Sequence, residues 1–150
     1  MNQELMVAAI ENGTVIDHIP CNKLFEVISL LGLQNLTSTV MIGYNLASSK
    51  MGTKSLVKIA DRFFTDEELN RLAVVAPNVN LSIIKNYNVV EKRQVEMPNP
   101  IVGVVKCANP KCITNNEPMR TRFVVSEKKQ GTICCHYCSR EQSVDTVKLV

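Results

Sequence analysis

The sequence predicts an α+β fold in which an antiparallel sheet with two helices is followed by a small all-β domain. Before residue 97, short alternating apolar runs are separated by two segments with helical apolar spacing. A proline-bearing junction at Met97–Pro100 follows, and beyond it the chain becomes rich in cysteine and basic residues. We therefore place one domain at residues 1–97 and a second at residues 101–150.

Two strands and a helix open the predicted order. Leu5–Ile10 is an apolar run, and Thr14–Ile19 alternates apolar and polar residues after it. The dipeptide Asn12-Gly13 lies between them and is typical of a tight hairpin turn, because both of its residues tolerate positive φ. From Asn22 to Leu31 the apolar residues recur at helical spacing, which predicts one amphipathic helix.

Two more strands, a helix and a final strand follow. Thr39–Leu46 and Ser55–Phe63 have the β-branched, alternating composition of strands. Thr65–Glu68 has the pattern of a capping box at a helix start, and Val79–Ile84 with Tyr87–Val90 supplies a last strand that is bent or interrupted near Asn86. The order strand-strand-helix-strand-strand-helix-strand places both helices on one face of an antiparallel sheet, close to a ferredoxin-like sandwich.

The second domain contains five of the six cysteines in one motif, CANPKC and then CCHYC. Cys107 and Cys112 are separated by four residues, and Cys135 and Cys138 by two. Each pair can supply two thiolates to one ion, and four thiolates around tetrahedral Zn²⁺ leave no position open for water or substrate. The motif therefore predicts one structural zinc ion, which contributes folding energy directly because so short a domain has little apolar material.

Strands of the zinc-binding domain are predicted from alternating segments: Ile101–Val105, Arg122–Val125, Thr132–Cys134 and Val144–Leu149. Cys134 is an alternative ligand to Cys135, but the two-residue gap between Cys135 and Cys138 favours Cys135. His136 lies between two ligands and is expected to face outward. Cys21, far from the motif, is interpreted as a small residue at a helix start or in the core.

The chain's charge excess lies in its second part. Residues 1–100 hold nine Lys and Arg against ten Asp and Glu, and residues 101–150 hold eight against four, so the net charges are −1 and +4. A basic half fits nucleic acid, an acidic protein surface or a solvated face. No apolar run has the length of a membrane span and no leader pattern opens the chain, so we expect a cytoplasmic protein, which also fits paired cysteines.

Candidate catalytic groups are sparse. Asp17 and His18 are adjacent at a strand end, where alternate residues point to opposite faces, so they are interpreted as polar strand-end residues. The scattered lysines are interpreted as solvated, and the sequence has no glycine-rich phosphate loop or nucleophile elbow. Composition alone predicts a binding module and not an enzyme.

Several motifs, taken together and in order, resemble one known family. They are Gly13–Pro20 (GTVIDHIP), Met51-Gly52 with Lys54 and Lys58, Asn86–Val90 (NYNVV) and the two cysteine pairs. Across essentially the whole chain they resemble the regulatory chains of aspartate carbamoyltransferase. The resemblance implies a non-catalytic allosteric subunit of pyrimidine biosynthesis, with an N-terminal nucleotide-binding domain and a C-terminal zinc domain that docks on the catalytic chain.

The resemblance also implies the binding residues and partners. The base would lie against main-chain groups of Ala9 and Ile10 and near Tyr87, and the ribose against Asp17 and Lys58. His18 and Lys92 would face the triphosphate. The implied effectors are CTP as inhibitor, ATP as activator and UTP beside CTP, and the implied assembly contains dimers of regulatory chains.

Two other functions compete with this interpretation. A nucleic-acid-binding zinc ribbon would use the basic second half and would bind with steep salt dependence, but only Phe123 and Tyr137 offer aromatic stacking there. A small zinc enzyme would need an open coordination position, and four thiolates leave none.

Two features depart from the pattern of the aspartate carbamoyltransferase regulatory chains. They are Cys134 and the stretch Arg93–Met97.

Overall fold

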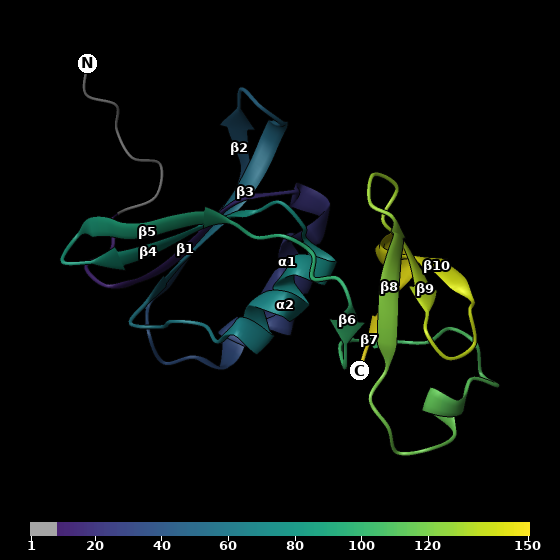
Figure 1. Ribbon diagram of the computed structural model, residues 1–150. Helices are drawn as coiled ribbons and strands as arrows, with labels where there is room; N and C mark the ends of the chain where they lie inside the picture. The colour runs from purple at the N-terminus through teal and green to yellow at the C-terminus, as the bar shows by residue number, and fades with distance from the viewer. Residues whose placement is uncertain (1–8) are drawn as a thin grey trace. The chain divides into compact units, whose positions relative to one another are not determined.

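The computed structural model describes residues 9–150, and the chain divides into two compact units between Glu96 and Met97. The first unit contains five strands and two α-helices within the described residues (Figure 1). In chain order these are β1 (Gly13–Ile19), α1 (Leu24–Leu30), β2 (Val40–Ser48), β3 (Gly52–Ala60), α2 (Asp66–Val75), β4 (Asn80–Lys85) and β5 (Asn88–Gln94). Short 3-10 turns, η1 (Cys21–Lys23) and η2 (Leu33–Asn35), flank α1.

The five strands form one antiparallel sheet in the order β2-β3-β1-β4-β5. The first four strands and the two helices follow the β-α-β-β-α-β order of a ferredoxin-like fold, and β5 is added at the edge. Both helices pack against one side of the sheet, here called the inner face (Figure 1). The opposite side is called the outer face. The α+β class predicted from the sequence is confirmed.

The core of this unit lies between the inner face and the helices. Its sheet side chains are buried and alternate along their strands, as the period of two requires. They include Ile16, Val57, Ile59 and Leu81, which pack with Leu24, Val27, Leu69 and Leu72 of the helices. The residues between them in sequence, such as Val15, Lys58 and Ser82, therefore face the outer side.

The predicted hairpin at Asn12-Gly13 is wrong. Leu5–Ile10 was its expected first strand; residues 5–8 lie outside the described residues, and Ala9 and Ile10 have no strand structure. Both edges of β1 are occupied, since Gly13 pairs with Ala60 of β3 on one side and with Ile84 of β4 on the other. Gly13, the second residue of the predicted turn, therefore lies inside a strand that is paired on both sides.

A hairpin turn occurs instead at Asn86-Tyr87, inside the predicted final strand. Asn86 has φ 52° and Tyr87 has φ 66°, which is the pair of positive values that a type I′ turn requires. The segment is therefore interrupted at Asn86, one of the two predicted alternatives, and forms the two paired strands β4 and β5. Strand β3 also ends at Ala60, earlier than the predicted Phe63, because Asp61 adopts φ 56°.

The predicted start of the second helix is confirmed. The Thr65 hydroxyl accepts a hydrogen bond from the Glu68 N–H, and the Glu68 carboxylate accepts one from the Thr65 N–H. This reciprocal capping box satisfies two backbone donors that the first helical turn leaves free. The helix then buries Leu69, Leu72 and Ala73 against the sheet.

The second unit is all-β, with small sheets and two 3-10 turns. A four-stranded sheet has the order β10-β9-β8-β6, and β7 pairs with β11. The elements are β6 (Ile101–Val102), β7 (Val105–Lys106), η3 (Ile113–Asn115), β8 (Arg122–Glu127), β9 (Thr132–Cys135), β10 (Glu141–Ser143), η4 (Val144–Thr146) and β11 (Lys148–Leu149). The predicted segments Ile101–Val105 and Val144–Leu149 are thus interrupted, the first at Gly103, which has φ 70°.

No helix in residues 9–150 is long and apolar enough to cross a membrane.

Candidate functional site

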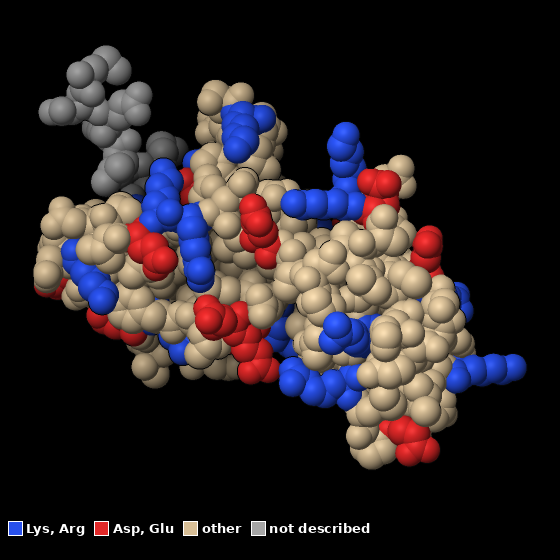
Figure 2. All heavy atoms as spheres, in the orientation of Figure 1, with Lys and Arg blue, Asp and Glu red and all other residues tan. Residues whose placement is uncertain are grey.

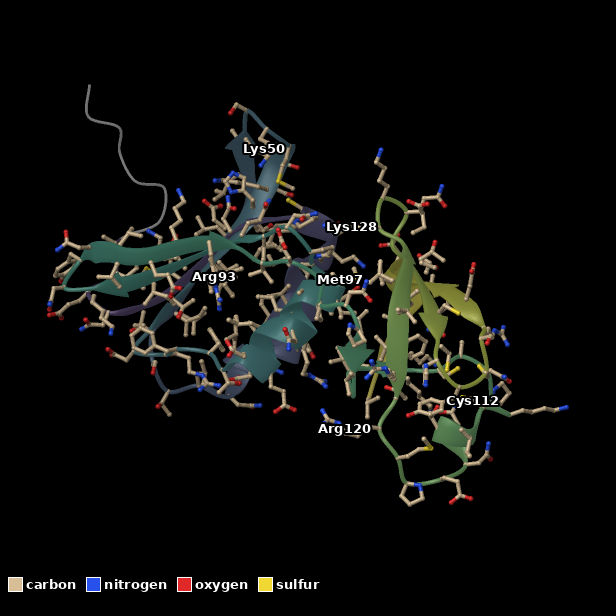
Figure 3. All side chains as sticks on the ribbon, in the orientation of Figure 1. Lys50, Arg93, Met97, Cys112, Arg120 and Lys128 are labelled. Atoms are coloured by element: carbon tan, nitrogen blue, oxygen red, sulfur yellow. The ribbon has the colours of Figure 1, made fainter. Side chains whose placement is uncertain are left out.

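Four cysteine side chains converge at one end of the second unit, where Figure 3 shows sulfur atoms gathered beside the label Cys112. They are Cys107, Cys112, Cys135 and Cys138, and their Sγ atoms all lie within 4.8 Å of one another. Cys107 Sγ is 3.6 Å from Cys138 Sγ, and Cys112 Sγ is 3.8 Å from Cys135 Sγ. A regular tetrahedron of thiolates around zinc has an S···S edge of about 3.8 Å, so the cluster has the size of such a shell.

Local structure positions each sulfur. Cys107 directly follows β7 and Cys112 precedes η3, while Cys135 ends β9. The loop between the first pair is fixed by Asn115, whose side-chain amide donates to the carbonyls of Cys107 and Asn109 at 2.9 and 2.7 Å. The structure thereby presents both pairs without any rearrangement of the backbone.

The surroundings affect the four thiols unequally. Burial raises the pKa of Cys107 to about 12, although the Asn109 N–H donates to its sulfur. Burial also opposes ionisation of Cys138, but hydrogen bonds from the Arg140 N–H and the Asn109 side chain outweigh it and lower the pKa to about 7. These N–H donors all stabilise negative sulfur, which is the form that binds a metal.

The two neighbours of the cluster do not join it. Cys134 Sγ lies against the backbone carbonyls of Cys135 and Ser139, at 3.7 and 3.4 Å. His136 is exposed, and its ring packs edge-on against Tyr137 at 5.0 Å, while its backbone N–H donates to the backbone carbonyl of Arg122. The described ligand atoms near the cluster are therefore four sulfurs, with Cys135 in the position favoured by its spacing.

On the first unit, the sheet register aligns several residues expected to bind nucleotide. Lys58 of β3 pairs with Val15 of β1, Val15 pairs with Ser82 of β4, and Ser82 pairs with Lys92 of β5. Cross-strand partners point to the same side of a sheet, so both lysines lie in one row on the outer face. Three strand spacings separate them, which is roughly 14 Å.

Asp17 and His18 lie near this row, and their side chains converge. The Asp17 carboxylate accepts from Lys54 Nζ at 2.9 Å, and His18 Nδ1 lies 2.9 Å from the Asn80 side-chain amide nitrogen. The expectation that adjacent side chains point to opposite faces is wrong here. The register of β1 shifts after Ile16 and His18 adopts φ 61°, which turns its ring to within 3.7 Å of Asp17.

Lys58 is half-buried on this face, and its environment makes its ammonium group more acidic than that of an exposed lysine. Burial lowers the pKa of Lys58, while the Asp17 carboxylate partly offsets that effect by attracting the ammonium group. An added polyanion would favour the charged form further. The protonation of this lysine is therefore coupled to what binds beside it.

Ala9, Ile10 and Tyr87 belong to neighbouring segments. The Tyr87 N–H donates to Glu11 O at 2.9 Å, and the Asn86 N–H donates to the Asn12 side chain at 3.2 Å. These bonds hold the segment before β1 against the β4–β5 turn. Ala9 is exposed, Ile10 is buried, and the Tyr87 side chain is 66% exposed, so its ring is available to a ligand.

Comparison with known proteins decides the family. Residues 5–96 match the family described as aspartate carbamoyltransferase regulatory chain, allosteric domain, and residues 99–148 match the metal binding domain of the same regulatory chain. The chain belongs to the family of aspartate carbamoyltransferase regulatory chains. The family is regulatory, so this chain is a non-catalytic subunit and not an enzyme.

Relatives cover nearly the whole chain. A regulatory chain from Phocaeicola vulgatus is 62% identical over 148 residues, covering 99% of this chain and 96% of the relative. One from Bacteroides fragilis is 57% identical, covering 99% and 97%. A more distant regulatory chain from Pyrococcus horikoshii is 46% identical and covers 96% of each. The four-cysteine cluster falls within the family's metal binding domain, and together these findings support a bound metal.

Sequence analysis of this regulatory chain missed three outer-face residues. Lys54 was interpreted as solvated, but it forms an ion pair with Asp17. Its spacing of four residues from Lys58 puts both on one side of β3, and that period could have indicated the pairing. Asn80 and Ser82 had no such signal, because only the pairing of β4 with β1 brings them beside the charged groups.

Proposed function

We propose that this chain binds CTP as an inhibitor and ATP as an activator on the outer face of its first unit, with UTP acting beside CTP. The domain roles are a nucleotide-binding allosteric domain at residues 1–97 and a zinc-binding domain at residues 101–150. The observation that carries the nucleotide site is the outer-face row of Lys58 and Lys92 beside the Asp17–Lys54 pair and His18. Cationic side chains can bind the phosphates of a nucleotide, and a carboxylate can accept hydrogen bonds from the hydroxyl groups of its ribose.

The residue roles we propose are those that the family resemblance implies, and the position of Asp17, Lys58 and Lys92 on one face supports them. Main-chain groups of Ala9 and Ile10 and the ring of Tyr87 would take the base at the β4–β5 turn. Asp17 and Lys58 would hydrogen-bond the ribose. His18 and Lys92 would meet the triphosphate, because cationic donors form the strong, short hydrogen bonds that phosphate oxygens accept. Lys54 would help by orienting the Asp17 carboxylate.

Zinc is the metal we propose for the cysteine cluster, one structural ion per chain. Cys107, Cys112, Cys135 and Cys138 offer four sulfur donors at tetrahedral size, a set that suits zinc. Reduced thiols of this kind fit a cytoplasmic location. When bound, the ion would fix the loops that carry the cysteines.

The proposed partner of the second unit is the catalytic chain of aspartate carbamoyltransferase, and regulatory chains would pair as dimers. Figure 2 shows Lys and Arg side chains, with some Asp and Glu, around the margin of this unit, and a broad uncharged area between them on the face in view. A rim of charge around an uncharged centre is typical of a protein interface. This favours a protein partner over nucleic acid for the basic half.

Titration calorimetry on the purified chain tests the nucleotide site. We expect saturable heats with CTP and with ATP, and weaker binding of the nucleoside cytidine, because cytidine lacks the phosphates that His18 and Lys92 would contact. No binding of either triphosphate at millimolar concentration would count against the proposal. A short single-stranded RNA, titrated at low and high salt, tests the nucleic-acid alternative in the same experiment.

A further inference from the structure

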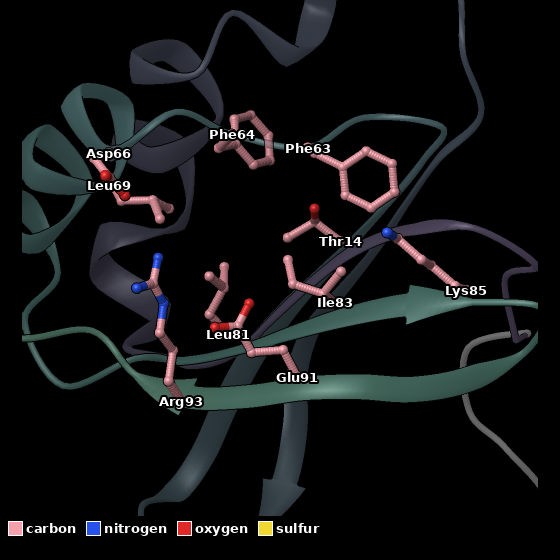
Figure 4. A pocket seen from close by; sticks show the side chains of 10 residues that line it. All are labelled: Thr14, Phe63, Phe64, Asp66, Leu69, Leu81, Ile83, Lys85, Glu91 and Arg93. Atoms are coloured by element: carbon pink, nitrogen blue, oxygen red, sulfur yellow. The ribbon is translucent and has the colours of Figure 1, made fainter.

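A cavity of about 420 Å³ lies on the inner face of the first unit's sheet, between the start of α2 and strands β4 and β5 (Figure 4). Its sheet side is formed by Leu81, Ile83 and Thr14, and Leu69 of α2 and the rings of Phe63 and Phe64 lie across from them. The volume lies within the range of small-molecule sites, which combine apolar walls with a few polar groups.

The cavity and the proposed nucleotide site share strands but not residues. On β5, Glu91 and Arg93 line the cavity, while Lys92 between them is paired with Ser82 on the outer face. On β4, Ile83 lines the cavity and its neighbour Ser82 faces outward. The alternation of a strand therefore places two distinct binding surfaces back to back.

The polar groups of the cavity are balanced in charge. Figure 4 shows Arg93 and Glu91 extending from β5 into the cavity, with Asp66 and Lys85 at its two ends. Among residues 9–150, these four side chains form no ion pair within 4.0 Å. Lys85 instead lies over the Phe63 ring, 5.8 Å from its centroid. Two cations and two anions thus surround the apolar side chains of the cavity.

We propose that this cavity binds a small zwitterion with an apolar body, which in chemical class is an α-amino acid with an aliphatic or aromatic side chain. The Arg93 guanidinium is suited to grip its carboxylate with two parallel hydrogen bonds. The Glu91 carboxylate meets its ammonium group, and the side chain lies on Leu81 and Ile83 beneath the phenylalanine rings. A nucleotide is not suited to a cavity with equal numbers of positive and negative side chains, because the carboxylates of Glu91 and Asp66 would repel its phosphates.

This inference rests on the cavity and not on the nucleotide site, so the two can fail separately. The ligand would also contact the β4–β5 hairpin, which carries Lys92 and Tyr87 on its other surfaces. Occupancy of the cavity would therefore stiffen the strands that present those residues to a nucleotide. That provides a physical route by which an amino acid could modulate nucleotide binding.

The test is an amide NMR titration of the full chain with L-leucine and L-phenylalanine. We expect saturable shifts confined to residues 61–69, 81–85 and 91–93. Leucinamide, which lacks the carboxylate, should bind more weakly than leucine. Arg93→Gln should weaken leucine about tenfold or more, since it removes a charge-assisted pair, and it should abolish the preference for leucine over leucinamide.

Lys50→Gln is the matched control, because it also replaces an exposed cation of the first unit, in the turn between β2 and β3 and outside the cavity lining. It should leave the leucine affinity unchanged. Arg93 is exposed, so we expect the Arg93→Gln variant to fold, and its amide spectrum verifies this. The proposal is overturned if neither amino acid causes saturable shifts, if leucinamide binds as well as leucine, or if Arg93→Gln binds leucine with the affinity of the unchanged chain.

Discussion

At the scale of single residues, backbone conformation controls where charge is presented. His18 occupies the left-handed region at the end of β1, and this turn brings its ring beside Asp17 and Asn80. The period-2 rule cannot predict such a turn, because the register shift that permits it depends on how β1 meets β3. The side chains of Asp17 and Lys58, in contrast, point to the sheet face that the period-2 alternation of their strands predicts.

Gly13 is a residue whose replacement should be damaging. A Cβ built on it would lie 2.1 Å from the Ile59 carbonyl oxygen, and its φ is 141°. We expect Gly13→Ala to lower the free energy of unfolding by about 3 kcal/mol or more, because the clash is with backbone that cannot move aside. Urea denaturation followed by circular dichroism measures this change.

Gly32→Ala is the matched comparison. Gly32 also has positive φ, at 63°, but nothing lies within 4 Å of its added Cβ. Only the conformational cost applies there, about 1 kcal/mol. Equal losses for the two variants would contradict the role assigned to the contact between β1 and β3.

The lowered pKa of Lys58 predicts how nucleotide affinity depends on pH. The protonated Lys58 ammonium is the form that donates charge-assisted hydrogen bonds to the ribose hydroxyls, so the contribution of Lys58 is complete below its lowered pKa and is lost as the pH rises through that value. The loss should therefore begin below pH about 10, where ordinary lysines titrate. Calorimetric CTP titrations across this range should show the decline, and Lys58→Gln should remove that part of it. A decline that is identical in the Lys58→Gln variant would place the titrating group elsewhere.

At the scale of elements, local signals located the helices better than the strand pairs. The α2 capping box depends on residues three apart, so the sequence contained all of its information. Strand pairing depends on distant partners. Asn12-Gly13 has the composition of a hairpin turn, yet β3 and β4 occupy both sides of β1, while Asn86-Tyr87 forms the turn without a glycine.

The capping box gives a prediction for α2. Thr65→Ala removes the acceptor for the Glu68 N–H and should cost about 1 kcal/mol of stability. Thr37→Ala is a suitable control, because Thr37 is exposed and lies outside the helices. Thermal unfolding of the two variants compares them directly. A Thr65→Ala variant as stable as Thr37→Ala would show that the cap contributes nothing measurable.

At the scale of the whole molecule, the two units are stabilised by different means. The first has a continuous apolar core between sheet and helices. The second buries few large apolar side chains, chiefly Phe123, Ile101 and Ile133, around its cysteines. The spacing of the cysteines was enough to predict the cluster, because a tetrahedral shell restricts the ligands to a few patterns. The small sheets around it were less predictable, since short strands have weak alternation.

Metal removal should therefore unfold the second unit selectively. A strong chelator should expose residues 97–150 to proteolysis while residues 9–96 stay protected, because metal binding supplies folding free energy that the small core does not. Limited proteolysis with mass spectrometry reads out both units in one sample, and added zinc should restore protection. A second unit that resists protease after the metal is gone would contradict this division.

The central claim is that nucleotide bound on the outer face changes the behaviour of a catalytic partner. The most direct measurement is the aspartate saturation curve of the enzyme reassembled from this chain and its catalytic chain, with and without CTP. The account predicts that CTP shifts the half-saturating aspartate concentration by about fivefold or more, and that Lys92→Ala requires much more CTP for the same shift. An enzyme that ignores CTP, or a Lys92→Ala enzyme with the same CTP dependence as the unchanged one, would contradict it.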